Sequence, residues 1–254
     1  MTRAMNSQKW ALFLKINLGV FVLIVLQGCN SSQKQDREHL VFKYNEHSNI
    51  ATLDPAFARN PQTIWPSNQL FNGLVQLDDQ LNIQPDIAKS WRINDSTSTY
   101  TFTLRDDVYF HKNKVFKKDS TRSVVAQDFV YSFDRLLSPE LASPGSWVFN
   151  AVQRYHAAND STLVIQLNKP FPAFLGLLSM RYCSVVPKEA IAYYGNDFRS
   201  NPVGTGPFRF KFWEENVKLV LRKNPMYFEK ETQGNRRPYL EAVAINFLKD
   251  IKSA

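Results

Sequence analysis

The chain has 254 residues, of which 44% are hydrophobic and 13% aromatic, so it can bury the core of one or two globular units. Its formal net charge of +8 is spread along the sequence, which argues against a nucleic-acid partner. Two cysteines and four scattered histidines form no disulfide or metal-ligand pattern, and we expect neither a metal nor a cofactor.

The N-terminus has the features of a secretory signal. Arg3, Lys9 and Lys15 lead into an apolar run over residues 16–26, and no acidic residue occurs before Cys29. Eleven helical residues rise about 16 Å, far less than the roughly 30 Å hydrocarbon core of a bilayer. The run therefore predicts a cleaved signal peptide and not a membrane anchor.

The signal ends in Leu-Gln-Gly-Cys, which resembles a lipobox in which the cysteine is diacylated. We predict a lipoprotein signal peptide over residues 1–28, lipidation at Cys29 and a disordered polar tether over residues 29–38. An ordinary signal peptide with a chance cysteine is the alternative.

Strands dominate the next part of the chain. The alternation over residues 99–105 predicts a half-buried strand with Tyr100, Phe102 and Leu104 facing inward. Asp54, which precedes a proline, indicates the start of a loop and not a catalytic carboxylate. The other expected elements are a strand over residues 40–44, a helix over 63–74, a short strand over 75–77 and a helix or turn over 87–91.

The clearest helix spans residues 124–137, where Phe129, Phe133 and Leu137 recur every four residues and predict the core-facing side. Cys183 lies in an apolar, strand-like run and is expected to be a buried structural residue. Further elements are expected as strands over residues 163–167, 208–213, 217–222 and within 239–247, and as helices over 173–178 and from 187.

Two charged segments are candidates for functional sites. The basic run over residues 111–118 could suit a nucleic acid or an anionic membrane, but a solvated loop is the preferred interpretation. Asp78 and Asp79 are adjacent in a turn, where their carboxylates point apart. The histidines fall in no nucleophile–base motif, so we expect a non-enzyme and keep an extracytoplasmic hydrolase only as an alternative.

A turn rich in glycine and proline occurs late in the chain. Its glycines are expected to adopt backbone angles closed to other residues, with a positive φ at Gly206, while its prolines restrict theirs. It lacks the third glycine and the Lys-Ser/Thr of a phosphate-binding loop. Its defining residues are Asn201, Pro202, Gly204, Thr205, Gly206 and Pro207.

This turn completes a set of blocks that resembles the family 5 extracellular solute-binding proteins, the dipeptide and oligopeptide receptors of bacterial ABC importers. The turn over residues 95–98 and the lysine-rich segment after His111 depart from the family pattern at the surface. Seven collinear blocks carry the resemblance: residues 53–55, 70–74, 85–91, 100–105, 126–135, 186–188 and 201–208.

The resemblance implies an α/β fold of the type II periplasmic-binding-protein kind, with mixed sheets and two lobes that close over a cleft. Residues 39–70 and 161–254 would form the first lobe, and residues 71–160 an inserted α/β subdomain. Because the relatives are considerably longer, it also predicts that this chain is truncated before the second lobe.

The function that the resemblance implies is that of a monomeric receptor, extracytoplasmic or periplasmic and anchored to a membrane through Cys29, which passes short peptides to an ABC permease. A non-peptide cargo (nickel, haem or an oligosaccharide) and a structural or interaction lipoprotein remain as alternatives. Six residues match positions near the ligand, with plain surface loops as the alternative: Arg59, Asn60, Pro61, Gly145, Ser146 and Trp147.

Overall fold

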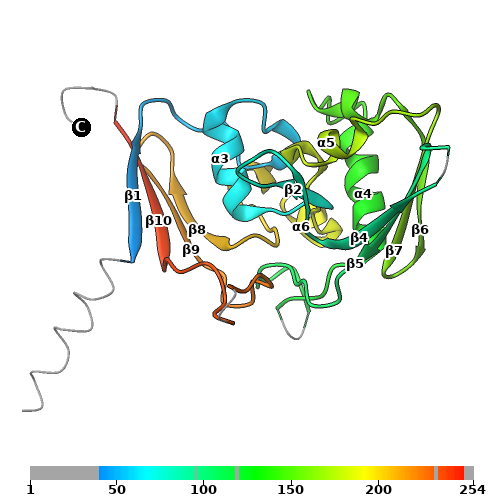
Figure 1. Ribbon diagram of the computed structural model, residues 1–254. Helices are drawn as coiled ribbons and strands as arrows, with labels where there is room; N and C mark the ends of the chain where they lie inside the picture. Colours follow the sequence, from blue (N-terminus) through cyan, green and yellow to red (C-terminus); the bar gives the residue numbers. More distant parts are fainter. Residues whose placement is uncertain (1–39, 95, 118–119, 232–233, 249–254) are drawn as a thin grey trace, which may run out of the picture. The chain divides into compact units, whose positions relative to one another are not determined.

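The computed structural model describes residues 40–94, 96–117, 120–231 and 234–248. The chain divides into two compact units, residues 1–41 and 42–254, and of the first only residues 40 and 41 are described. The predicted signal peptide, Cys29 and the tether therefore lie outside the described residues. The architecture below is that of the second unit (Figure 1).

The first sheet has four strands in the order β1-β10-β9-β8 (Figure 1). Leu219 and Leu221 alternate along β9 and are buried on one face, against Ile245 and Val243 of the neighbouring strand. This period of two explains why the strands could be predicted. The bounds are β1 (Val41–Glu46), β8 (Phe208–Glu214), β9 (Lys218–Lys223) and β10 (Ala242–Phe247).

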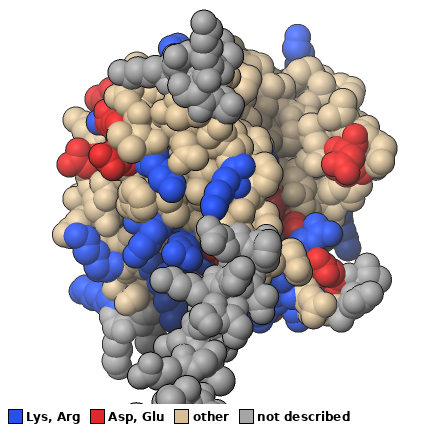
Figure 2. All heavy atoms as spheres, turned by 90° about the vertical axis from the view of Figure 1, so that its left-hand side faces the viewer, with Lys and Arg blue, Asp and Glu red and all other residues tan. Residues whose placement is uncertain are grey.

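The opposite face of this sheet carries basic side chains. Arg209 and Arg222 are direct cross-strand neighbours on β8 and β9, and both are exposed. Figure 2 looks onto this side of the unit and shows Lys and Arg side chains gathered around its middle. This face of the sheet therefore presents positive charge to the solvent.

The second sheet also has four strands, in the order β4-β5-β7-β6, with antiparallel neighbours. Tyr100, Phe102 and Leu104 are each at most 1% exposed, which confirms the inward face predicted for this strand. The bounds are β4 (Ala88–Ile93), β5 (Thr99–Leu104), β6 (Val152–Asn159) and β7 (Thr162–Leu167), and a separate pair is formed by β2 (Val75–Leu77) and β3 (Ile83–Pro85).

The helices are short, and α4 contacts β6 and β7 of the second sheet. They are α3 (Pro61–Leu70), α4 (Ala126–Leu137), α5 (Phe174–Leu178) and α6 (Lys188–Tyr194), with 3-10 turns at Pro55–Phe57, Ser146–Phe149, Arg181–Cys183 and Gly195–Ser200. None of the helices among the described residues is long and apolar enough to cross a membrane.

One core position of α4 was predicted wrongly. Phe129 and Phe133 are fully buried, but Leu137 is 41% exposed and Leu136 is buried in its place. At about 100° per residue, position 136 lies roughly 20° from position 129 around the helix axis, whereas position 137 lies roughly 80° away. A strict four-residue spacing drifts off the buried face within two turns.

Two predicted elements are of another type. Residues 87–91, expected as a helix or turn, enter strand β4, where an irregularity between Ala88 and Ser90 disturbs the alternation. The strand-like run around Cys183 contains a 3-10 turn, Arg181–Cys183. The helix expected over residues 63–74 is α3, which begins two residues earlier and ends at Leu70.

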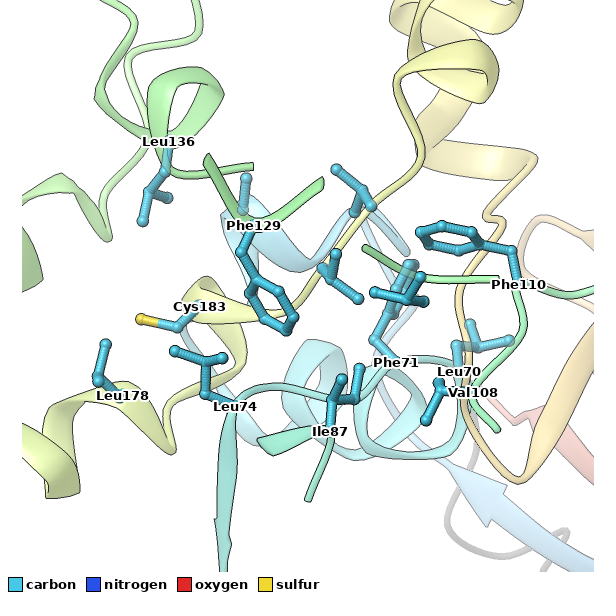
Figure 3. Close-up of a cluster of buried hydrophobic side chains, with 14 of the residues drawn as sticks. Leu70, Phe71, Leu74, Ile87, Val108, Phe110, Phe129, Leu136, Leu178 and Cys183 are labelled. Carbon is cyan, nitrogen blue, oxygen red and sulfur yellow. The ribbon is translucent and has the colours of Figure 1, made fainter. Parts of the chain in front are cut away.

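The buried side chains form one continuous cluster that joins α3, α4 and the segments between the sheets (Figure 3). Leu70 and Phe71 at the end of α3 lie in it beside Phe110. Cys183 is 1% exposed, as predicted, and burial raises the pKa of its thiol to about 12. The division into lobe and subdomain stays a prediction, and its boundary at residue 160 falls between two strands of one sheet, β6 and β7.

Candidate ligand-binding site

The glycine-rich turn packs directly against the end of α3. Gly206 donates its backbone N–H to the carbonyl oxygen of Leu70 at 2.9 Å. A Cβ added to Gly204 would lie 2.0 Å from that same oxygen, and one added to Gly206 would lie 2.5 Å from the carbonyl oxygen of Gln69. Close approach of two backbones therefore requires glycine at both positions.

The expectation of a positive φ at Gly206 is wrong. Among the described residues, the glycines with a positive φ are Gly195 and Gly234, which lie outside the turn. The glycines of the turn are needed for the absence of a side chain and not for an unusual backbone angle.

His111 ties the turn to the segment that connects β5 to α4. The backbone N–H of Gly204 donates to Nδ1 at 3.3 Å, so Nδ1 carries no proton, and Nε2–H donates to the carbonyl oxygen of Gly206 at 3.0 Å. Burial lowers the pKa of His111 to about 4. The solvated loop expected here is therefore wrong at its first residue, which is 4% exposed, and at Phe116, which is 7% exposed.

A buried polar network lies beside the turn. Thr205 Oγ1 donates to Asn72 Oδ1 at 3.0 Å, and Asn72 Nδ2 donates to Asp86 Oδ1 at 2.9 Å and to the hydroxyl of Tyr227 at 3.4 Å. The second oxygen of Asp86 accepts from the backbone N–H of Gly73 at 3.0 Å. Each group of the Asn72 amide has a partner, which is the condition for burying such a network without a large penalty.

The carboxyl group of Asp86 is only 2% exposed, and burial raises its pKa to about 7. The nearby negative charge of Glu229 adds to this effect, while the positive charge of Arg181 and the donors Gly73 and Asn72 oppose it. Because its pKa lies near neutrality, this carboxyl group is a weak counter-charge for its surroundings at physiological pH.

A cavity of about 700 Å³ opens beside this network, at the end of α3 and the 3-10 turn that follows α5. Its lining combines aromatic and apolar side chains with amides and two arginines. The residues are Ala58, Arg59, Ile64, Asn68, Gln69, Asn72, Gln76, Leu77, Trp147, Ser179, Met180, Arg181, Tyr182, Pro207 and Tyr227. Such a mixture of apolar walls and a few polar groups is typical of a small-molecule site.

The fold brings some of the sequence-predicted site residues to this cavity and not others. Arg59 and Trp147 line it, as does Pro207 of the turn. Asn60 caps α3, where its Oδ1 accepts from the backbone N–H of Thr63 at 3.1 Å. Pro61 is the first residue of that helix, a position where proline is favoured.

Gly145 and Ser146 do not line the cavity but support a residue that does. A Cβ on Gly145 would lie 2.3 Å from the ring of Tyr182, so the glycine lets that ring pack onto the backbone. The next residue starts the 3-10 turn Ser146–Phe149, which carries Trp147, a side chain that is 46% exposed.

Sequence reasoning missed the most buried charged groups of the site. Arg181 lies in a run whose apolar neighbours predict a strand, and Asp86 lies in one of the blocks that resemble the family. Asp86 follows β3, and Asn72 lies two residues beyond the end of α3, so their contact depends on tertiary pairing that the sequence does not show.

A second cavity, of about 570 Å³, is lined by Arg59 and Asn60 together with an ion pair. Arg135 Nη1 and Nη2 donate to the two carboxylate oxygens of Asp54 at 3.1 and 2.5 Å. Asp54 also accepts from the backbone N–H of Ala56 at 3.0 Å. The carboxylate therefore caps a 3-10 turn and pairs with a cation, which gives it a structural role.

The described residues contain no group of three or more His, Cys, Asp or Glu side chains that could hold a metal ion. What the first cavity can offer a ligand is hydrogen bonding, positive charge and aromatic surface.

Comparisons of the sequence and of the structure with known proteins point to the same family. A family model for bacterial extracellular solute-binding proteins, family 5 (middle), matches residues 82–254. The chain is 31% identical to the periplasmic oligopeptide-binding protein OppA of Salmonella typhimurium, over 82% of this chain and 40% of that one. It is 30% identical to the probable deoxycholate-binding periplasmic protein YgiS of Escherichia coli, over 74% and 37%.

Among solved structures, the chain is similar to the periplasmic binding protein DppA of Helicobacter pylori in complex with the peptide STSA. The TM-score is 0.74 at 27% identity, and the match covers 84% of this chain and 43% of that one. The chain thus spans about two fifths of the length of the relatives it matches. The match also confirms the expected type II periplasmic-binding-protein fold.

Proposed function

The chain belongs to the bacterial extracellular solute-binding proteins of family 5, and we propose that it forms one wall of the ligand cleft of a receptor that delivers short peptides to an ABC-type import permease. The 700 Å³ cavity beside the glycine-rich turn is the observation that carries this proposal. The peptide-bound DppA structure, which has the same fold over the matched part, supports a peptide as the ligand.

Within this cavity we assign ligand contacts to Arg59 and Trp147, which both line it. Asn60, Pro61, Gly145 and Ser146 are proposed to act indirectly, by positioning α3 and the ring of Tyr182. Hydrogen bonds to the peptide backbone and apolar contacts would hold the ligand without a nucleophile or a general base. The same proposal includes that the receptor acts as a monomer when it delivers peptides to the permease.

Peptide binding is tested on the complete product of the coding region, purified from the compartment in which it occurs naturally. Short peptides should raise the melting temperature, because a ligand that binds only the folded state stabilises it. If peptides leave the melting temperature unchanged but nickel, haem, an oligosaccharide or deoxycholate raises it, that compound would be the cargo instead. A protein that responds to none of these would favour the structural or interaction lipoprotein.

We also propose that the mature protein is extracytoplasmic and held at a membrane by a lipid on Cys29. The support is the Leu-Gln-Gly-Cys sequence after the apolar run, together with relatives named as periplasmic. Cys29→Ser should move the protein from the membrane to the soluble fraction, with Cys183→Ser as the matched control. Persistence of the first variant in the membrane fraction would contradict the anchor.

A further inference from the structure

The charged residues that line the first cavity are all positive. Of the described residues that line it, two are arginines, Arg59 and Arg181, and none is Asp or Glu. Arg59 is exposed, and none of the ion pairs found in the described part of the chain includes either arginine. A bound ligand would therefore meet two positive charges that form no ion pair with a carboxylate.

Arg181 is the better placed of the two. Nη1 donates to the carbonyl oxygen of Phe71 at 3.1 Å and Nη2 donates to that of Ser179 at 3.2 Å, so the guanidinium is fixed by neutral acceptors. A guanidinium has five N–H donors, and a carboxylate can accept two of them side by side.

The surroundings of Arg181 offer it only a partial counter-charge. Burial lowers its pKa, which shows that the charged form is disfavoured by desolvation, and the charge of Asp86 opposes this effect. Burial raises the pKa of Asp86 to about 7, which weakens this carboxyl group as a counter-charge. Glu229, the other nearby carboxylate, is 3.6 Å from Arg237. A cation removed from water without a partner is costly, and an anionic ligand would relieve that cost.

The rest of the lining suits a ligand with an apolar body. Trp147 and Met180 are 46% and 37% exposed and present apolar surface to the cavity. Tyr182 and Tyr227 add aromatic surface on the same cavity.

We propose that this cavity selects a peptide that carries a carboxylate against this wall, held by Arg181 with Arg59 as a second, outer contact. The proposal rests on the peptide-binding function above and adds a preference for anionic ligands. The carboxylate can come from an acidic side chain or from the C-terminus of the peptide, and both present the same planar pair of oxygens.

The test compares three peptides on the complete product of the coding region: Ala-Glu-Ala, Ala-Gln-Ala and the C-terminal amide of Ala-Gln-Ala. A charge-assisted pair predicts a loss of affinity of about tenfold or more when the selected carboxylate is removed. Weaker binding of Ala-Gln-Ala than of Ala-Glu-Ala would identify the side chain, and weaker binding of the amide than of Ala-Gln-Ala would identify the C-terminus. Equal affinity for all three peptides overturns the preference while leaving peptide binding intact, whereas binding of none overturns both.

Variants then assign the preference to this cavity. Arg181→Gln should abolish most of the discrimination between the favoured peptide and its uncharged counterpart, and Arg59→Gln should reduce it. Arg92→Gln, which removes an exposed arginine of β4 outside the cavity, should leave it unchanged. If Arg181→Gln does not fold, Arg181→Met, which removes the charge and keeps much of the apolar stem, takes its place beside Arg59→Gln. A preference that is undiminished in both of these variants would place its source outside this cavity.

Discussion

The α-carbon of Gly204 lies so close to Leu70 that a Cβ built on it would be 2.0 Å from the leucine carbonyl oxygen. The obstructing atom belongs to the backbone at the end of α3, and this carbonyl oxygen of Leu70 also accepts a hydrogen bond from the backbone N–H of Gly206. It cannot move aside as a flexible side chain could. The close packing of turn and helix thus depends on a missing methyl group.

We therefore expect Gly204→Ala to destabilise the protein by about 1–3 kcal/mol or more, as overpacking of a rigid site does. Gly176→Ala is the matched control, because a Cβ at that position in α5 meets no atom within 4 Å. Alanine is also favoured over glycine within a helix by about 0.5–1 kcal/mol. Thermal unfolding of the two variants should show opposite shifts, and a neutral Gly204→Ala would contradict the packing argument.

His111→Gln should change how stability responds to acid. The pKa of His111 in the fold is about 4, below its ordinary value of 6.5, so between these values the unfolded chain binds a proton that the folded protein resists. The contribution of His111 is present above about pH 6.5 and is lost as the pH falls towards 4, by on the order of 3 kcal/mol. The glutamine amide can retain a donor for Gly206 and an acceptor for Gly204 but does not titrate.

The measurement is the difference in the free energy of unfolding between wild type and variant, followed from about pH 7 to about pH 4. This difference should move in favour of the variant as the pH falls. His156→Gln, at an exposed position of β6, is the control for the substitution itself. A flat difference for His111→Gln would mean that the imidazole is not held neutral.

Asp86→Asn should show the opposite dependence. Burial raises the pKa of Asp86 from 3.8 to about 7, so the folded state holds a proton that the unfolded chain releases. Its contribution is present below about pH 3.8 and is lost as the pH rises to about 7, by on the order of 4 kcal/mol. The free energy of unfolding of the variant should therefore increase relative to that of the wild type as the pH rises from about 4 to about 7.

The two residues act in opposite directions over the same pH range, so the wild-type curve alone cannot separate them. The double variant His111→Gln/Asp86→Asn is the check, because it should lose both dependences. Chemical denaturation at several pH values measures these stability differences. If the stability of Asp86→Asn relative to the wild type increased as the pH fell, the raised pKa of Asp86 would be contradicted.

Local sequence patterns were sufficient for most of the fold and insufficient for the site. Alternation along β5 predicted Tyr100 and Phe102 correctly, because successive side chains of a strand point to opposite faces of its sheet and only one face is packed on the core here. The pattern was insufficient at β4, where an irregularity beside Ala88 breaks the alternation, and around Cys183, where buried apolar residues occur in a 3-10 turn.

Local sequence patterns predicted even less of the candidate site than of the fold. Arg59 and Trp147 could be proposed because they match family positions, and both reach the cavity. Asp86, His111 and Arg181 carry its unusual electrostatics, yet each is unremarkable in the sequence. Their pKa values depend on burial and on partners far along the chain, which only the tertiary structure supplies.

A last prediction concerns the ion pair between Asp54 and Arg135, whose side chains are 5% and 13% exposed. Removing one member of a buried pair leaves the other without a counter-charge and costs about 3–5 kcal/mol. Asp54→Asn keeps an acceptor for the backbone N–H of Ala56, so its effect should come from the lost charge. Arg135→Met removes the cation and keeps much of the apolar stem.

The double variant Asp54→Asn/Arg135→Met should cost clearly less than the sum of the single variants, because neither charge remains to be desolvated. Glu215→Gln is the control: it breaks the pair with Arg199, whose members are 50% and 47% exposed, and should cost at most about 1 kcal/mol. Chemical denaturation of the four variants measures the coupling. Additive single effects would show that the two side chains contribute independently, and the pair would then not be what holds α4 to the turn at Pro55–Phe57.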